Sequence, residues 1–155
     1  MNPEFTTIAL RVGGLSRKAL TAALTAAHIE RDDAARTLLQ TMPVYPGERP
    51  YPIRLGLMRM RDLGLGQGAT LPRLTQAAQH YGLGLVPLAA AVYLRLQWRT
   101  QAPGQVFVAS PALSNLGPRG FVLVNTDSRL QLHGFYTGDN ELVDPDTTFA
   151  FELSV

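Results

Sequence analysis

The sequence predicts an α+β fold, with an N-terminal strand and helices followed by an antiparallel β-sheet meander. Up to about residue 82, the segments expected to be helical carry apolar residues at three- and four-residue spacing; from Ala91 onward apolar and polar residues alternate. Five successive strands without a helix are typical of antiparallel sheets. A length of 155 residues corresponds to about one domain. We therefore expect a single domain over residues 1–155, helical over about 1–82 and sheet-forming over about 91–155.

The first elements follow from alternation and capping. Glu4–Val12 alternates as a strand does and is ended by Gly13-Gly14. Ser16 is a good N-cap for a helix over Arg17–Ala27. A second helix is predicted over Asp32–Thr41, whose acidic first turn suits the helix dipole.

The middle of the chain begins with a proline-rich segment. Pro43–Pro52 holds four prolines and one glycine, which predicts an extended loop that acts as a hinge. Ile53–Met60 alternates and is predicted to be a strand. Thr70 caps a helix over Leu71–Tyr81, and Gly82 stands where a helix-ending glycine is expected.

The last part of the chain is predicted to form the sheet. In Val92–Arg99 apolar side chains alternate with Tyr93, Arg95, Gln97 and Arg99, which a strand would place together on one face. Four more strands are predicted, over Val106–Ser110, Phe121–Asn125, Leu130–Tyr136 and Thr147–Val155.

Charged residues make up 17% of the chain, against about 25% in typical globular domains. So few charges predict a relatively apolar or glycine- and proline-rich surface, which would suit a partner; the equally favoured alternative is a compact domain encoded by a GC-rich genome. Residues 1–119 carry a net charge of +7 and residues 120–155 a net charge of −5. We favour the interpretation that the two parts pack together and neutralise each other; the alternative is a polar interaction surface.

Several classes of site are disfavoured. The absence of cysteine excludes disulfides, thiolate nucleophiles and Cys-ligated metals. His28, His80 and His133 lack metal-ligand spacing, and Gly64–Gly68 lacks both the full dinucleotide fingerprint and a P-loop lysine. We therefore expect no metal and no cofactor. With no signal peptide and no membrane span expected, a soluble cytoplasmic protein is the simplest prediction.

Catalysis has little support in the sequence. Asp139, Glu141, Asp144 and Asp146 lie in one loop that lacks EF-hand spacing, so a solvated acidic loop is favoured over a Ca²⁺ site. No serine lies in a GxSxG motif. A small hydrolase or transferase would need scattered residues in one cleft, with His133, Asp139 and Asp144 together.

Two binding surfaces are candidates. The first is the row of Tyr93, Arg95, Gln97 and Arg99, which would contact a protein partner, with the Pro43–Pro52 loop as a flexible edge. The second is an arginine cluster that would bind nucleic acid, with tyrosines nearby to stack on bases. Its members are Arg49, Arg54, Arg59 and Arg61, beside Tyr45 and Tyr51.

Most of the chain, and residues 63–101 above all, resembles an uncharacterised bacterial family with the core pattern LGF..GAT…GL.LCPAEVGP.LRLQY. The resemblance is carried by Leu63-Gly64-Leu65, Gly68-Ala69-Thr70, Gly82-Leu83, Pro87 and Leu94–Trp98. It implies a strand and two short helices before this core and short strands after it, and it implies no activity. The Cys and Glu of the pattern are replaced by Val86 and the apolar Leu88–Ala91, which weakens the enzyme hypothesis.

The leading hypothesis is a non-catalytic protein-binding module, such as an accessory or immunity-type component of a bacterial system. Nucleic-acid binding is the first alternative, and a small hydrolase or transferase is the second. Binding to nucleic acid would weaken as the salt concentration rises, whereas an apolar contact with a protein would persist at high salt. An exposed sheet edge would also allow a homodimer.

Overall fold

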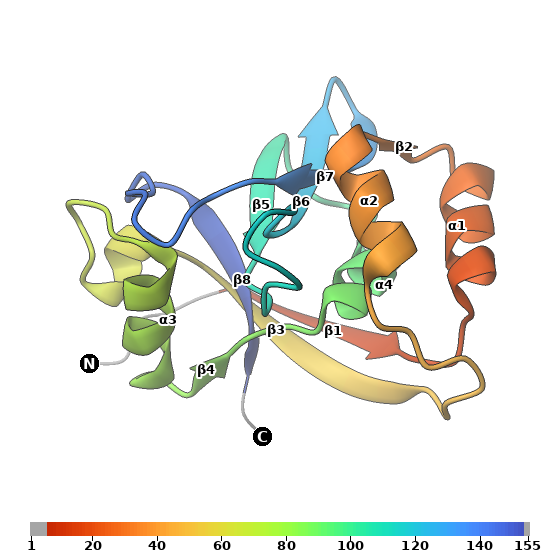
Figure 1. Ribbon diagram of the computed structural model, residues 1–155, viewed down its shortest axis with the longest axis horizontal. Coiled ribbons are helices and arrows are strands. Elements are labelled where there is room, and N and C mark those ends of the chain that lie inside the picture. The colour runs from red at the N-terminus through yellow and green to blue at the C-terminus, as the bar shows by residue number, and fades with distance from the viewer. Residues whose placement is uncertain (1–5, 154–155) are drawn as a thin grey trace.

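The computed structural model describes residues 6–153, which form four α-helices and an eight-stranded mixed sheet (Figure 1). The α+β prediction is confirmed, and most neighbouring strands are antiparallel. In chain order the elements are β1 (Thr6–Val12), α1 (Arg17–Ala26), β2 (Glu30–Arg31), α2 (Asp33–Thr41), β3 (Tyr51–Arg59), the 3-10 turn η1 (Met60–Leu63), α3 (Leu71–Gln79), β4 (Leu83–Gly84), α4 (Leu88–Gln97), β5 (Gly104–Val108), β6 (Gly120–Thr126), β7 (Arg129–Phe135) and β8 (Thr148–Leu153).

The strands lie in the order β1-β3-β8-β5-β6-β7-β2, and β4 pairs with β8. Strands β5, β6 and β7 form an antiparallel meander. The chain then crosses back, and β8 pairs antiparallel with β3 and parallel with β5. The sequence predicts a sheet confined to about residues 91–155. This is wrong, because the sheet also includes β1 and β3.

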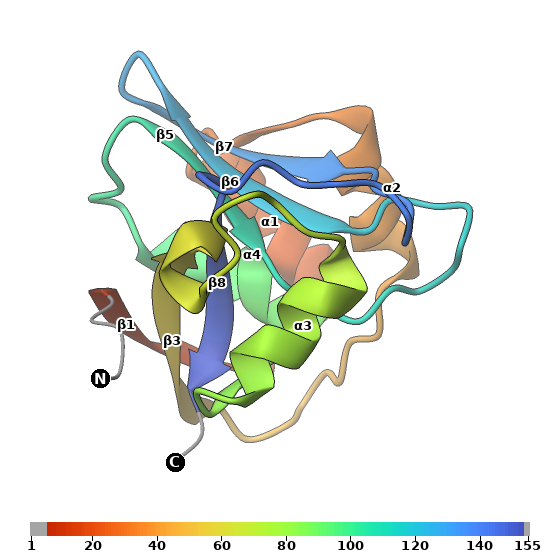
Figure 2. The ribbon, with the colours of Figure 1, turned by 90° about the vertical axis from the view of Figure 1, so that its left-hand side faces the viewer.

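Both faces of the sheet are covered, as expected for a sheet whose inner strands are apolar on both sides. One core contains α1, α2 and α4 against side chains such as Leu55, Val108 and Ala150. The other contains η1 and α3 against Phe149 and Phe151. Figure 2 shows α3 in front of the sheet, with α1, α2 and α4 behind it.

The predicted strand over Val92–Arg99 is wrong, because this segment lies mainly in helix α4. Residues Ala90 to Arg95 are all buried, since the helix is packed on nearly every side between α1 and the sheet. A helix that is buried on all sides has no polar face, so its sequence lacks the 3.6-residue period of apolar positions. The alternation of apolar and polar residues over Val92–Arg99 therefore resembles that of a strand by chance. The useful signal was Pro87 followed by leucine and three alanines, a strong helix start.

Outside α4 the predicted elements agree with the structure to within about two residues at their ends. The two-residue strands β2 and β4 were not predicted, and β3 begins at Tyr51, inside the predicted Pro43–Pro52 loop. Ser16, Asp32 and Thr70 cap α1, α2 and α3 through their side-chain oxygens. The β6–β7 turn has positive φ at Asp127 and Ser128, as tight hairpins require. The ends of two predicted strands, at residues 4–5 and 154–155, lie outside the described residues.

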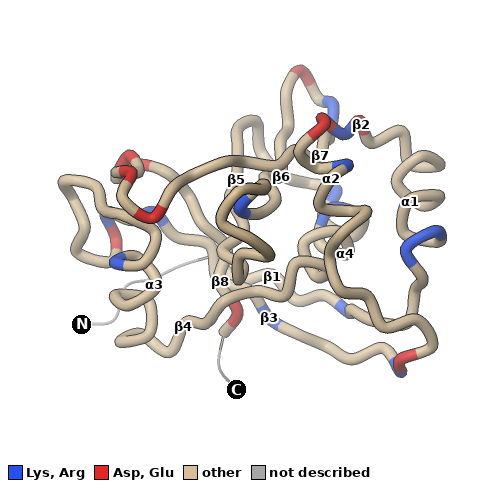
Figure 3. The backbone as a smooth tube through the Cα atoms, in the orientation of Figure 1, with Lys and Arg blue, Asp and Glu red and all other residues tan. Residues whose placement is uncertain are grey.

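The opposed charges of the two parts of the chain meet across the fold. Arg61 contacts Asp146 at 2.8 Å, and Arg119 contacts Asp139 at 2.8 Å. Figure 3 shows the acidic 139–146 loop beside the end of the molecule that carries η1 and α3. These ion pairs support the interpretation that the opposed charges neutralise each other internally. No helix within residues 6–153 has the length and hydropathy to cross a bilayer.

Candidate functional site

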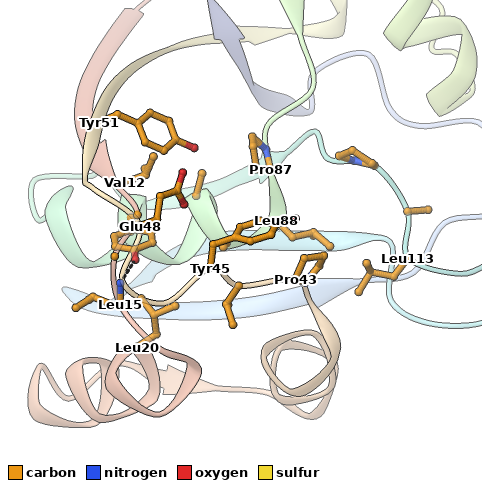
Figure 4. Close-up of a pocket in the computed structure, with 18 residues that line it drawn as sticks. Val12, Leu15, Leu20, Pro43, Tyr45, Glu48, Tyr51, Pro87, Leu88 and Leu113 are labelled. Atoms are coloured by element: carbon orange, nitrogen blue, oxygen red, sulfur yellow. Dashed lines mark hydrogen bonds between the residues drawn. The ribbon is translucent and has the colours of Figure 1, made fainter.

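A cavity of about 340 Å³ opens beside the first turn of α4, and we call it the α4 cavity (Figure 4). Five separate segments of the chain surround it: the end of β1 with the following turn, α1, the proline-rich loop, the start of α4, and the loop after β5. Its lining residues are Val12, Gly13, Gly14, Leu15, Leu20, Pro43, Val44, Tyr45, Glu48, Tyr51, Pro87, Leu88, Ala89, Ala90, Tyr93, Pro111, Ala112 and Leu113.

The Gly13-Gly14 turn brings one wall of the cavity against the proline-rich loop. Both glycines have positive φ, a conformation that favours glycine. A Cβ on Gly14 would lie 2.9 Å from the carbonyl oxygen of Glu48, and the Gly14 carbonyl accepts a hydrogen bond from Gly47 at 3.1 Å. This close backbone approach fixes Glu48 at the edge of the cavity.

Tyr93, on α4, also lines the cavity. Its hydroxyl accepts a hydrogen bond of 2.9 Å from the backbone N–H of Leu15, which ties α4 to the Gly13-Gly14 turn. Only 7% of Tyr93 is exposed. The sequence placed Tyr93 on a wet strand face, and its burial in α4 corrects that expectation.

Large exposed apolar side chains gather at the mouth of the α4 cavity. Among residues 6–153, eight large hydrophobic residues are exposed, and four of them line this cavity. They are Leu15 at 39%, Tyr45 at 69%, Tyr51 at 40% and Leu113 at 41%. An apolar concavity bordered by exposed aromatic side chains is typical of a binding site.

Glu48 is the only charged residue in the lining of the α4 cavity. Within residues 6–153, no arginine, lysine or histidine nitrogen lies within 4 Å of its carboxylate. Burial raises the pKa of the neighbouring Tyr51 phenol, and the charge of Glu48 raises it further. The cavity thus combines apolar walls, three tyrosine side chains and one carboxylate without an ion-pair partner in the described residues.

The first turn of α4 lines the cavity through Leu88 and Ala89, next to the N-cap Pro87. Pro87 is the N-cap and offers no side-chain acceptor. In the described part of the chain, the N–H groups of Leu88 and Ala89 have no backbone acceptor. Amides at the start of a helix that have no acceptor within the helix can donate hydrogen bonds to a ligand oxygen, such as a carbonyl.

The other predicted protein-contact residues do not share a surface. Arg95 is fully buried in the core, Gln97 hydrogen-bonds both backbone groups of Arg11, and Arg99 is exposed. Arg99 borders a polar depression of about 800 Å³ beside the β6–β7 hairpin. The prediction that these side chains and Tyr93 form one exposed row is therefore wrong, because the segment coils as a helix.

Arg95 is a buried cation held by neutral acceptors. Its guanidinium donates to Gln101 Oε1 and to the Trp98 carbonyl, both at 2.7 Å, and to the carbonyls of Val124 and Gln131 at 3.4 Å. Burial lowers the pKa of Arg95 to about 10, with a further contribution from Arg99. The side chain remains charged at neutral pH and joins α4 to β6 and β7.

The arginine cluster proposed for nucleic acid is divided. Arg54 and Arg59 are five positions apart on β3, so strand alternation places them on opposite faces. Arg59 contacts Asp62 at 3.3 Å, and Arg61 contacts Asp146 at 2.8 Å. Arg49 lies in the proline-rich loop before β3, whereas Arg61 lies in η1, after β3.

These ion pairs predict a small acid-dependent loss of stability. The hydrogen bond from Arg61 holds the pKa of Asp146 below its usual value, so its contribution is present above about pH 4 and is lost as pH falls through the lowered pKa. Because the side chains are exposed, the effect is small. In urea unfolding, Asp146→Asn should therefore have a lower midpoint than wild type at pH 6. At pH 2 the two midpoints should be the same. An equal difference at both pH values would contradict this.

The residues considered for catalysis are dispersed. Asp139 lines a second cavity of about 340 Å³ with Arg119 and the buried Ser110, whereas Asp144 borders a different depression. His133 lines neither of these and has its Nδ1 3.8 Å from Asp32. Within residues 6–153, no group of three His, Asp or Glu side chains has an arrangement that would hold a metal.

Comparison of the chain with protein-family models, with curated proteins and with solved structures gives no match. Sequence reasoning drew attention to the proline-rich loop with Tyr45 and Tyr51 but missed Glu48 and Leu113. The signal for these was weak, because nothing local indicates that loops so far apart in sequence meet at α4.

Proposed function

We propose that this chain is a non-catalytic protein-binding module whose contact surface is the α4 cavity and its rim. The observation that carries the proposal is the gathering of Leu15, Tyr45, Tyr51 and Leu113 around one apolar cavity. Interface centres are enriched in aromatic side chains and depleted of charge, and this surface has that composition.

The chemistry of the lining supports binding rather than catalysis. Its ionisable groups are one carboxylate and three phenols, and it contains no histidine, serine, threonine or lysine. General acid–base or nucleophilic catalysis needs a second group within hydrogen-bond reach of the first. Pro43, Pro46 and Pro50 restrict the backbone of the loop before β3, in contrast to the flexible edge expected from the sequence, and this lowers the entropy lost on binding.

Two leucines of one loop provide a matched test. Leu113 lines the α4 cavity, whereas Leu116 is 95% exposed and lies outside it. Tagged wild type, Leu113→Ser and Leu116→Ser would be used for affinity purification from the native host at about 50 and 500 mM salt. We expect one stoichiometric protein with wild type and Leu116→Ser at both salts, and its loss with Leu113→Ser.

Two results would contradict this proposal. One is capture of nucleic acid at low salt only, without a protein, which would favour the arginine hypothesis. The other is a protein partner that Leu113→Ser retains and Leu116→Ser loses, which would place the contact surface elsewhere. Circular dichroism of the variants controls for folding.

A further inference from the structure

The α4 cavity has a polarity that restricts what it binds. Its walls are formed mainly by aliphatic side chains and prolines, and its one charge is the unpaired carboxylate of Glu48. Figure 4 shows Glu48 between Tyr51 and Tyr45 on one side of the cavity, with Leu113 at the other end. Glu48 is exposed, so its carboxylate is solvated in the free protein; a cationic ligand gains a charge partner there, whereas an anionic ligand would be repelled.

The two tyrosines next to Glu48 favour a planar cation. Tyr45 and Tyr51 are exposed at 69% and 40%, so their rings are accessible. A guanidinium stacks on aromatic faces and also pairs with a carboxylate through two N–H groups, which an ammonium does less well. Glu48 also helps to raise the pKa of Tyr51, after burial, which places the Tyr51 phenol within the field of this carboxylate.

The start of α4 favours a peptide over a free cation. Leu88 and Ala89 belong to the same lining as Glu48, and within residues 6–153 their N–H groups have no backbone acceptor. A peptide residue would offer a backbone carbonyl to such amides as well as a side chain to the carboxylate, whereas a free cation offers only the second. A cavity of about 340 Å³ is at the small end of ligand sites, which suits one large side chain.

We propose that the α4 cavity receives an arginine side chain presented by the partner protein. The aliphatic stem of that arginine packs on Leu88 and Leu113, and its guanidinium pairs with Glu48 between Tyr45 and Tyr51. This inference rests on the proposed function, since it names the chemistry of the partner at the same surface. Arginine is among the residues that carry most binding energy at interfaces.

The test uses Nα-acetylarginine methylamide and its neutral isostere, Nα-acetylcitrulline methylamide. Each would be titrated to about 100 mM into the ¹⁵N-labelled full chain while the amide resonances of Leu15, Val44 and Leu113 are followed by NMR. We expect the arginine probe to bind about five-fold or more tightly than the citrulline probe, the effect of a single charge pair of about 1 kcal/mol. Glu48→Gln should remove this preference, and Glu141→Gln, an exposed carboxylate outside the cavity, should keep it.

Equal binding of the two probes, no shift at the cavity, or an unchanged preference in Glu48→Gln would overturn the inference. If Leu113→Ser still removes the protein partner in that case, the proposed function stands and only the arginine anchor fails. If the arginine preference depends on Glu48 but Leu113→Ser retains the partner, the proposed function fails. The cavity would then be a site for a free guanidinium compound, and the inference about a protein anchor would fail with it.

Discussion

Arg95→Ala is expected to lower the free energy of unfolding by about 3–5 kcal/mol, the range of large-to-small changes in a well-packed core. Arg95 is among the largest fully buried side chains of the protein. Its removal leaves a cavity beneath α4 and takes the donors from Gln101 Oε1 and the Trp98 carbonyl. Buried acceptors without donors each cost about 1–3 kcal/mol.

Arg95→Met separates the role of volume from the role of charge. Methionine fills much of the same space and removes a cation whose burial is itself costly, as its lowered pKa of about 10 indicates. We expect this variant to be more stable than Arg95→Ala by about 2 kcal/mol. Urea unfolding followed by the fluorescence of Trp98, the single tryptophan, measures both variants directly.

The explanation of Arg95 fails under either of two results. An alanine variant within about 1 kcal/mol of wild type would mean that the guanidinium network contributes little. A methionine variant less stable than the alanine variant would mean that filled volume does not matter at this position.

Gly134→Ala is expected to cost about 2–3 kcal/mol through overpacking between β7 and α2. A Cβ at Gly134 would lie 2.7 Å from the Cβ of Ala34 and 2.9 Å from its carbonyl carbon, so the helix itself has to move. That movement also strains Asp32, whose Oδ1 accepts hydrogen bonds from Ala35 N at 2.8 Å and from Gly134 N at 3.0 Å. Helix α2 loses its N-cap and its contact with the sheet together.

Gly84→Ala is the matched control for this prediction. Gly84 also lies in a strand, and the nearest atom to its added Cβ is the Glu152 carbonyl oxygen at 3.9 Å, an ordinary contact. Its free energy of unfolding, measured by urea unfolding, should differ from that of wild type by less than about 0.5 kcal/mol. Equal midpoints for the two alanine variants would contradict the overpacking argument.

The local sequence was sufficient where an element carries its own signals. Ser16, Asp32 and Thr70 marked three helix starts correctly, because a capping side chain bonds an amide only three residues away. Helix α4 was misread because its environment, and not its periodicity, determines which side chains are buried. Arg95 illustrates the difficulty, since an arginine in a sequence is normally read as exposed.

Only part of the candidate site could be predicted from the local sequence. The Pro43–Pro52 loop and its tyrosines were recognised as an edge of interest, but their role as one wall of a cavity was not. The wall opposite comes from α4 and from the loop with Leu113, which is more than 60 residues further along the chain. No local pattern records a meeting of segments so far apart.

The sequence by itself determined the α+β class, three helices with their caps, and the β5–β6–β7 meander, because each depends on contacts between residues close in the chain. Only the tertiary structure decided that β8 returns between β3 and β5, that α4 is a buried helix, and that Glu48 meets α4 across an apolar cavity. The reason is physical. Strand neighbours and cavities are selected by how well distant apolar faces pack together, and that free energy belongs to the whole core and to no single segment.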